Sequence, residues 1–451
     1  MTDTPTPTAR LAAIICGIDC AALDESTIAA VKRLIADGIA VAIAGSVEAP
    51  AKIVAGYVRD LAGPPLATVW GQGCKSTPGQ AAYANAVAMH VLDFEPMSNP
   101  PTHAVSPTVP VALALAEANG AHGRDIIAAC AKGFEIQGRI LLAARPARGS
   151  LPLHTPGVIG VMGAAAAASH LLGLDAPQLT HALGIAASRC SGLSANTGSM
   201  VKSTHCGNAG LSGLESALLA ARGFTANPDI FAAPHGYVAT FFPAHFDYDA
   251  LFEFGRPYRC VDPGMAIKFY PSKYPTHFAI KAALDARAAI GAGSRIREVR
   301  IVTPEIKDAN RPQPRSGLEG KFSFQYTAAA ALLDGKVGID SFTDERRFRA
   351  DMVELLGRIS VVYDKSIAPD TRTMHVTVEV TLDDGAKHSA ICRKPPGTWG
   401  EPIDADQHRA KIRDCLGVRM TASRVESALN LLDRLEDASA QDVAQLTALL
   451  A

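Results

Sequence analysis

The stretch PGVIGVMGAAAAASHLLGLD, residues 156–175, consists almost entirely of alanine, glycine and larger apolar residues. Alanine has the highest intrinsic helix propensity, and small residues at this density allow neighbouring helix backbones to approach closely. The apolar part, GVMGAAAAASHLLGL, is too short and too rich in alanine for a membrane span, which needs ~20 apolar residues. The stretch therefore predicts a helix packed among other helices.

Similar runs follow one another from about residue 8 to about residue 260, with glycine and proline between them. A helical pattern returns from about residue 400 to the C-terminus. Together these runs predict a large helical domain. Its predicted helices include residues 24–45, 79–94, 106–120, 123–144, 156–175 and 176–193.

Between the two helical parts, the sequence changes to a strand pattern in which apolar and polar residues alternate. This pattern covers residues 297–304, 357–364, 375–382 and 386–391. The last two segments are joined by Asp383, Asp384 and Gly385, which form a typical hairpin turn sequence. We therefore expect a mainly α protein, in which an all-helical domain of residues 1–268 and 399–451 carries an inserted α+β domain of residues 269–398.

The composition excludes several classes of function. With 43 basic and 44 acidic residues the net charge is -1, which gives no field for attracting nucleic acid or an anionic membrane. The nine cysteines include no CxxC pair, which argues against a disulfide scaffold and a thiolate metal site. The N-terminal segment lacks the features of a secretory signal, so we expect a cytoplasmic protein with reduced thiols.

Two segments combine ionisable side chains with turn residues. In VLDFEPMSNPPTHAVSP, residues 91–107, Asp93 and Glu95 precede His103, which stands between prolines that stiffen the loop. His154 lies directly before the glycine-interrupted helix, whose exposed N–H groups would favour a carboxylate. The alternatives are structural: capping or solvated acids, a loop histidine, and a hydrogen-bond partner at a helix start.

Two further segments supply cations. Lys202 and His205 are three residues apart and would face the same way on one helical turn. Lys268, Tyr270 and His277 fall at the predicted domain boundary, where ligand sites are common. The alternatives are a solvated Lys202, a core histidine at 205 and ordinary surface lysines at the boundary.

Taken together, these acids, histidines and lysines suit proton transfer at carbon on a substrate with several carboxylates. Cations would hold the carboxylates, and an imidazole or a carboxyl group would move the protons. The sequence contains no spacing typical of a metal site and no GxSxG motif of a serine hydrolase. We therefore expect no metal.

Several motifs, in the same order over nearly the whole chain, resemble the MmgE/PrpD family. They include THAVSPTVPVALALAE, HTPGVIGVMGAAAAASHLLGLD, VKSTHCGNAGLSGLESALLAARGF, IKFYPSKYPTHFAIKAALDA and NRPQPRSGLEGKFSFQYTAAAALLDG. The resemblance is greatest to the cis-aconitate decarboxylase branch. It implies a homodimer without a cofactor, in which the inserted α+β domain acts as a lid over the helical domain.

The resemblance also implies a pocket between the two domains. The family's catalytic residues match Asp93, His103, His154, Lys202 and His277. In this interpretation His103 or Asp93 acts as base or acid, His277 handles a second proton, and carboxylates are held by cations and by the helix after His154. The expected substrate-binding residues are Met97, Lys268, Tyr270 and His205.

The chain departs from the family pattern in the loop after Asp93. Pro96 and Met97 replace an aspartate and a threonine, and Asn99 stands where the epimerase branch has a lysine. The leading hypothesis is a cofactor-independent lyase acting on a small di- or tricarboxylate, by decarboxylation or dehydration. The alternatives are a dicarboxylate isomerase or epimerase and a catalytically silent protein that binds a metabolite.

Overall fold

The computed structural model describes residues 4–144 and 152–451, which form two compact units. The first unit comprises Met1–Val91, Glu95–Ile267 and Asp404–Ala451, and the second comprises Leu92–Phe94 and Lys268–Ile403. Residues 1–3 of the N-terminal segment and residues 145–151 of the first predicted domain lie outside the described residues.

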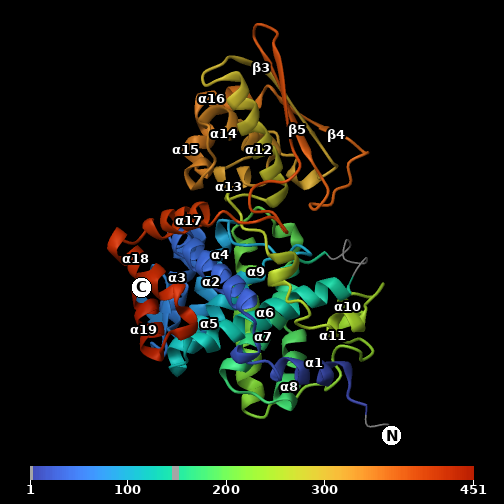
Figure 1. Ribbon diagram of the computed structural model, residues 1–451, viewed down its shortest axis with the longest axis vertical. Helices are drawn as coiled ribbons and strands as arrows, with labels where there is room; N and C mark the ends of the chain where they lie inside the picture. The colour runs from blue at the N-terminus through green and yellow to red at the C-terminus, as the bar shows by residue number, and fades with distance from the viewer. Residues whose placement is uncertain (1–3, 145–151) are drawn as a thin grey trace. The chain divides into compact units, whose positions relative to one another are not determined.

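The first unit is mainly helical, as the sequence predicts, and its helices run from blue to green and return in red in Figure 1. The prediction of an all-helical domain is wrong in one detail, because β1 (Ala67–Val69) and β2 (Cys74–Ser76) form a short antiparallel hairpin. The helices are α1 (Pro7–Cys16), α2 (Glu25–Gly45), α3 (Ala49–Leu61), α4 (Pro78–Val91), α5 (Val105–Asn119), α6 (Gly123–Ala143), α7 (Thr155–Leu171), α8 (Ala176–Ala187), α9 (Val201–Ala221), α10 (Tyr237–Phe241), α11 (Tyr248–Phe252), α17 (Ala405–Gly417), α18 (Ala422–Asp433) and α19 (Ala440–Leu449).

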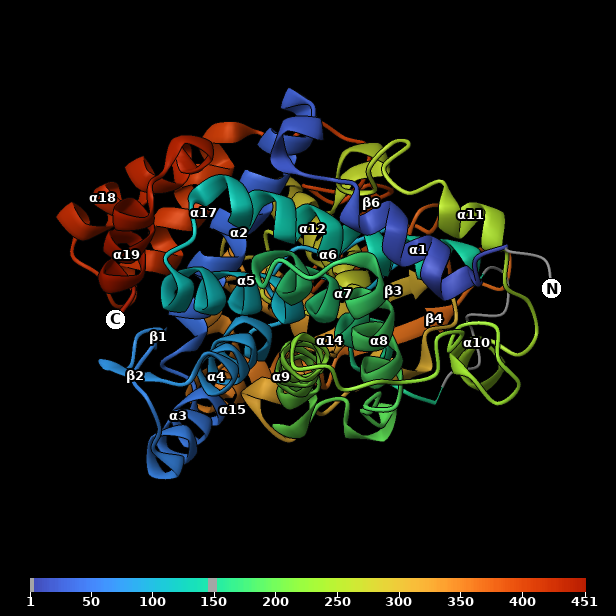
Figure 2. The same cartoon turned by 90° about the horizontal axis from the view of Figure 1, so that it is seen from below.

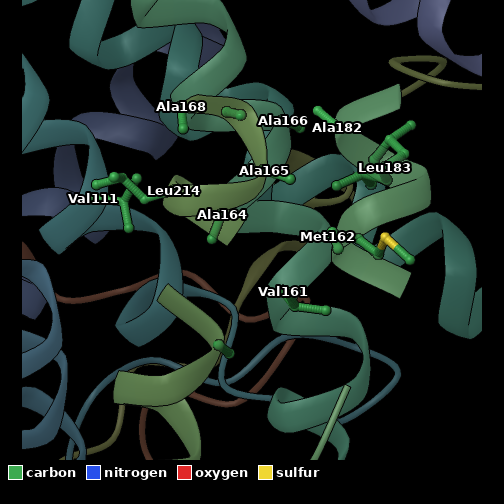
Figure 3. Close-up of a cluster of buried hydrophobic side chains, with 14 of the residues drawn as sticks. Val111, Val161, Met162, Ala164, Ala165, Ala166, Ala168, Ala182, Leu183 and Leu214 are labelled. Atoms are coloured by element: carbon green, nitrogen blue, oxygen red, sulfur yellow. The ribbon is translucent and has the colours of Figure 1, made fainter. Parts of the chain in front are cut away.

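The alanine-rich helix α7 lies at the centre of this unit, where it packs against α5, α6, α8 and α9 (Figure 2). Its small side chains, among them Ala164 and Ala165, lie in the hydrophobic core shown in Figure 3. A Cβ atom on Gly213 of α9 would lie 2.5 Å from Cβ of Ala164, so α9 approaches α7 more closely than alanine would allow. None of the helices within the described residues has the length and apolar character needed to cross a membrane.

A buried charge cluster joins α17, the first helix of the C-terminal segment of this unit, to α2. The Asp37 carboxylate of α2 is fully buried. It accepts hydrogen bonds from Lys411 Nζ at 2.8 and 2.9 Å and lies 2.8 Å from His408 Nε2. Burial acts to raise the pKa of Asp37, but Lys411 and His408 outweigh it and hold the pKa below 3.8. This cluster connects two segments that lie more than three hundred residues apart in the sequence.

The second unit contains a four-stranded sheet in the order β4-β3-β5-β6. Strands β3 (Ile296–Thr303) and β4 (Ile359–Tyr363) are parallel, and β5 (Val376–Leu382) pairs antiparallel with both β3 and β6 (Lys387–Cys392). The predicted hairpin is confirmed, with Gly385 at φ 88°. Helix α12 (Tyr274–Ile290) packs against β5 and β6, and the unit's other helices are α13 (Gly317–Gly320), α14 (Phe324–Asp334), α15 (Asp344–Phe348) and α16 (Ala350–Leu356).

The Asp37 cluster makes a prediction about stability. Replacing Asp37 with asparagine should lower the free energy of unfolding by about 3–5 kcal/mol, because the buried ammonium of Lys411 loses its countercharge. In the wild type this contribution is present above pH 3.8 and is lost as the pH falls towards the lower pKa of the folded protein. Urea denaturation measures both effects.

The matched control is Glu426→Gln, which breaks an exposed ion pair with Arg413. It should change the unfolding midpoint much less than Asp37→Asn. Equal changes in the two variants would contradict a stabilising role for the buried cluster.

Candidate active site

Four histidines from four separate segments form a cluster in the first unit. His90 is in the last turn of α4, His103 is in the loop before α5, His154 caps α7 and His205 is in α9. The ring centroids of His90 and His103 are 4.5 Å apart, and His154 lies 5.5 Å from His90, 6.1 Å from His103 and 5.3 Å from His205. The structure therefore brings together the predicted site residues His103, His154 and His205, and adds His90.

A buried carboxylate lies against two of these rings. Glu95 is 0% exposed, and its Oε1 atom accepts hydrogen bonds from Nδ1 of His90 and, at 2.9 Å, from Oγ of Ser106. Nδ1 of His103 lies 2.9 Å from the same oxygen. Three groups thus converge on one carboxylate oxygen.

Lys202 brings a cation to the cluster from the first turn of α9. It is one helical turn from His205, as the spacing predicts, and is only 8% exposed, so the solvated alternative is wrong. Nδ1 of His205 lies 3.2 Å from Nδ1 of His154. Helix α9 therefore supplies an ammonium group and an imidazole on the same face.

The surroundings hold the imidazoles of His90 and His154 neutral and the carboxyl group of Glu95 ionised at pH 7. Burial, followed by the charge of Lys202, lowers the pKa of His90 to about 4 and places the pKa of His154 well below 6.5. Burial acts to raise the pKa of Glu95, but His90 and His103 outweigh it and hold this pKa well below 4.5. The pair formed by His90 and Glu95 is therefore a neutral imidazole that donates to a carboxylate.

The loop that carries Glu95 and His103 is fixed by its backbone. Met97 pairs with Ala266, donating at 3.0 Å and accepting at 2.8 Å, and is 6% exposed. The guanidinium of Arg259 donates to the carbonyl oxygen of Asn99 at 3.0 Å. These contacts hold the prolines and polar residues of the loop in one conformation, which is the stiffness the sequence predicts.

The start of α7 is fixed in a similar way. The N–H group of His154 donates to the carbonyl oxygen of Gly192 at 2.8 Å. A Cβ atom on Gly157 would lie 2.0 Å from the carbonyl oxygen of Ser191, so only glycine fits at this position. The glycine in the first turn of α7 thus allows the chain segment 191–192 to hold His154 in place.

The remaining predicted site residues lie in the second unit. Lys268 is buried and donates to the carboxylate of Asp93 and, at 2.9 Å, to its carbonyl oxygen. Nε2 of His277 lies 3.2 Å from the carbonyl oxygen of Ser272. The ring of His277 lies 5.2 Å from that of Tyr270, whose pKa is raised to about 12 by burial. Asp93 thus already neutralises the cation that was expected to bind a carboxylate.

Three of the histidines form a candidate set of metal ligands. The nitrogens offered by His90, His103 and His154 all lie within 4.8 Å of one another. Around a tetrahedral zinc ion with bonds of 2.0–2.1 Å, the nitrogens would be about 3.3 Å apart. The cation of Lys202, which already lowers the pKa of His90 and His154, also opposes a divalent ion here. The cluster is better suited to moving protons and binding anions.

Sequence reasoning did not select His90 and Glu95 as site residues. Glu95 was noted only as part of the acidic loop, and His90 falls in an alanine-rich helix with no feature that marks it as functional. The available signal is their separation by five residues across the end of α4, which lets the chain turn back and bring the two side chains together.

Replacing Lys202 with methionine should raise the pKa of His90 and of His154. The positive charge of Lys202 disfavours both imidazolium forms, whereas burial, the larger cause, remains and keeps both values below 6.5. NMR titration of the histidine ring protons measures the change. Lys281→Met, which removes a partly exposed lysine paired with Asp285, is the control and should leave both pKa values unchanged. Unchanged values in Lys202→Met would show that the lysine does not act on the cluster.

Comparison with known proteins places the chain among enzymes of carboxylate metabolism. Residues 9–249 match the MmgE/PrpD N-terminal domain and residues 270–437 match the MmgE/PrpD C-terminal domain. The chain is 32% identical to cis-aconitate decarboxylase of Homo sapiens over 98% of its own length and 94% of that protein, and 31% identical to the Mus musculus protein over 98% and 93%. It is 27% identical to cis-aconitate decarboxylase of Aspergillus terreus over 90% of the chain and 89% of that protein. The chain belongs to the MmgE/PrpD family.

Proposed function

We propose that the protein is a lyase that acts on a small di- or tricarboxylate by proton transfer at carbon, without a cofactor. The relatives named above are cis-aconitate decarboxylases, which are lyases. One observation carries the proposal: a buried lysine lies among imidazoles that are neutral at pH 7. In this arrangement the ammonium group can bind an anion, and the imidazoles can transfer protons to or from it.

The chemistry of cis-aconitate decarboxylation shows what these groups must do. When the saturated arm loses CO2, the carbon–carbon bond breaks and its electron pair spreads over the double bond towards a remaining carboxylate. One proton added at the former vinylic carbon then gives methylenesuccinate. The charge that develops beside the carboxylate needs a fixed cation, and the carbon needs a proton donor.

Lys202 can supply the cation and a histidine the proton. A desolvated ammonium group binds a carboxylate more strongly than a solvated one, because the local dielectric constant is lower. The N-terminus of α7, which His154 caps, adds partial positive charge from its backbone N–H groups. Nδ1 of His103 lies 2.9 Å from Oε1 of Glu95, so this imidazole stands beside a buried carboxylate.

A dicarboxylate isomerase is the second candidate. Met97 offers a thioether where the family has a threonine hydroxyl, so a hydroxyl that could assist a leaving group is missing from this loop. Isomerisation needs proton removal and return but no leaving group. The same imidazoles could carry out both steps.

The test is to incubate the protein in D2O with cis-aconitate, citrate, 2-methylcitrate, citramalate, malate and iminodisuccinate, and to follow each by NMR. A decarboxylase should release CO2 and place one deuteron on the product carbon, whereas a dehydratase should release water and form a double bond; dialysis against a chelator should change neither rate. Lys202→Ala should lower kcat/KM by roughly 10- to 100-fold, the effect of ~1.5–3 kcal/mol for a lost charge-assisted contact.

Lys281→Ala is the matched control and should keep the wild-type rate, since Lys281 is partly exposed and paired with Asp285. Deuterium uptake into an acid without loss of any group would favour the isomerase. If no acid changed or took up deuterium, the lyase and the isomerase would both be wrong.

Position 97 should influence which acid is used. We expect the wild type to be slow with cis-aconitate and 2-methylcitrate, because methionine cannot donate a hydrogen bond to a substrate oxygen. The loss of that hydrogen bond should weaken transition-state binding by ~1–3 kcal/mol. Met97→Thr should therefore raise kcat/KM on one of these acids roughly 5- to 150-fold. Met200→Thr changes a methionine that is 48% exposed and serves as the control. If the wild type turned over either acid fast and Met97→Thr left that rate unchanged, residue 97 would not contribute to substrate specificity.

A further inference from the structure

We infer that His205 is a positioning residue for His154, whose imidazole it holds through a hydrogen bond between the two Nδ1 atoms. The Nε2 atom of His154 is then the nitrogen that exchanges a proton with the substrate. This inference rests on the proposed function. It gives His205 a role behind His154, in place of the direct contact with the substrate that the family resemblance implies.

The hydrogen bond joins two uncharged rings. Nδ1 of His205 lies 3.2 Å from Nδ1 of His154, and the ring centroids are 5.3 Å apart with the ring planes tilted by 54°. Burial, followed by the charge of Lys202, lowers the pKa of both rings below 6.5, so both are neutral at pH 7. A neutral imidazole has one N–H group and one lone pair, so one Nδ1 atom donates and the other accepts. The pair therefore shares a single proton between its Nδ1 atoms.

The backbone of Gly192 contacts both histidines. Its carbonyl oxygen accepts a hydrogen bond from the N–H group of His154 at 2.8 Å. A Cβ atom on Gly192 would lie 3.0 Å from Cγ of His205, so a side chain at this position would crowd the ring, and the φ angle of 103° also favours glycine. His205 itself is only 3% exposed. The fold thus holds His154 at two points, its backbone N–H group and its Nδ1 atom.

The contact at Nδ1 decides where the nitrogens of His154 lie. The torsion next to an imidazole ring is broad and roughly two-fold, so a ring without this contact could turn over and place carbon atoms where the nitrogens now are. Among the described residues, Nε2 of His154 makes no hydrogen bond and is not one of the buried atoms that lack a partner, so a substrate can reach it. A general acid or base must lie within hydrogen-bond reach of the proton that it moves, and His205 keeps the ring in one such orientation.

The experiment compares His205→Leu, which removes the hydrogen bond, with His205→Asn, whose amide can donate or accept near the position of Nδ1. His205→Leu should lower kcat roughly 10- to 100-fold, because a misplaced functional group can cost about 100-fold in rate. KM should change by less than about twofold, since His205 does not contact the substrate. His205→Asn should keep kcat within about fivefold of the wild type, because it retains the hydrogen bond.

The matched control is His181→Leu. His181 lies in α8, outside the histidine cluster, and its Nδ1 atom accepts a hydrogen bond from the N–H group of Ala226 at 3.2 Å. This variant should keep the wild-type kcat and KM. A wild-type kcat in His205→Leu would overturn the inference. A KM that rises about tenfold at unchanged kcat would also overturn it, because His205 would then contact the substrate directly.

An NMR measurement without substrate separates this inference from the proposed function. In protein labelled with 15N-histidine, one Nδ1 atom of the pair should carry a proton at pH 7 and the other should not. His205→Leu should change the nitrogen shifts of His154 and leave those of His170, at the other end of α7, unchanged. If these results are found but no acid in the panel reacts, the proposed function fails while the contact stands. Two protonated or two unprotonated Nδ1 atoms in the wild type would overturn the inference, whether or not His205→Leu folds.

Discussion

The close packing of α7 against α9 is the constraint on which the candidate site depends. Gly213 has no room for a Cβ atom beside Ala164, so the two backbones lie as near each other as small residues permit. His154 stands at the start of α7, and Lys202 and His205 stand at the start of α9. Because the helices are rigid and in contact, their N-terminal ends are held together as well, and the imidazoles and the ammonium group occupy fixed positions. A larger residue at 213 would push the two helices apart and would therefore move the site residues that they carry away from one another.

Two buried carboxylates in the first unit show how the same group can serve stability or chemistry. Both oxygens of Asp37 contact Lys411, and Oδ2 also contacts His408, so its charge is compensated where it lies. Glu95 uses its Oε1 atom for its contacts, and one of these contacts is the imidazole of His90, which is neutral at pH 7. The first arrangement joins α2 to α17. The second holds a buried carboxylate against the imidazoles of His90 and His103.

The pKa values of the clustered histidines are lowered by burial more than by any single neighbouring group. Burial is the largest cause of the lowered pKa of His90, His154 and His205, and Lys202 is the next in each case. A carboxylate substrate that entered the cluster would therefore meet a single strong cation in a region of low dielectric constant. The neutral imidazoles around it can accept or donate protons without first losing one to water, which suits proton transfer at carbon.

The sequence by itself determined the local structure and the types of residue in the site. Apolar periodicity and alanine content placed the helices of the first unit, and the Asp-Gly turn at 384–385 placed the hairpin of β5 and β6, because these signals act over a few residues. Only the tertiary structure decided which residues that are far apart in the chain contact each other. Three such contacts are the pairs Asp37 with Lys411, Asp93 with Lys268 and β3 with β4. The sequence pattern of each segment predicts its own structure but does not identify the segment that packs against it. The same holds for His90 and Glu95, since periodicity marks a residue as buried, but only the packed fold shows which side chain it meets.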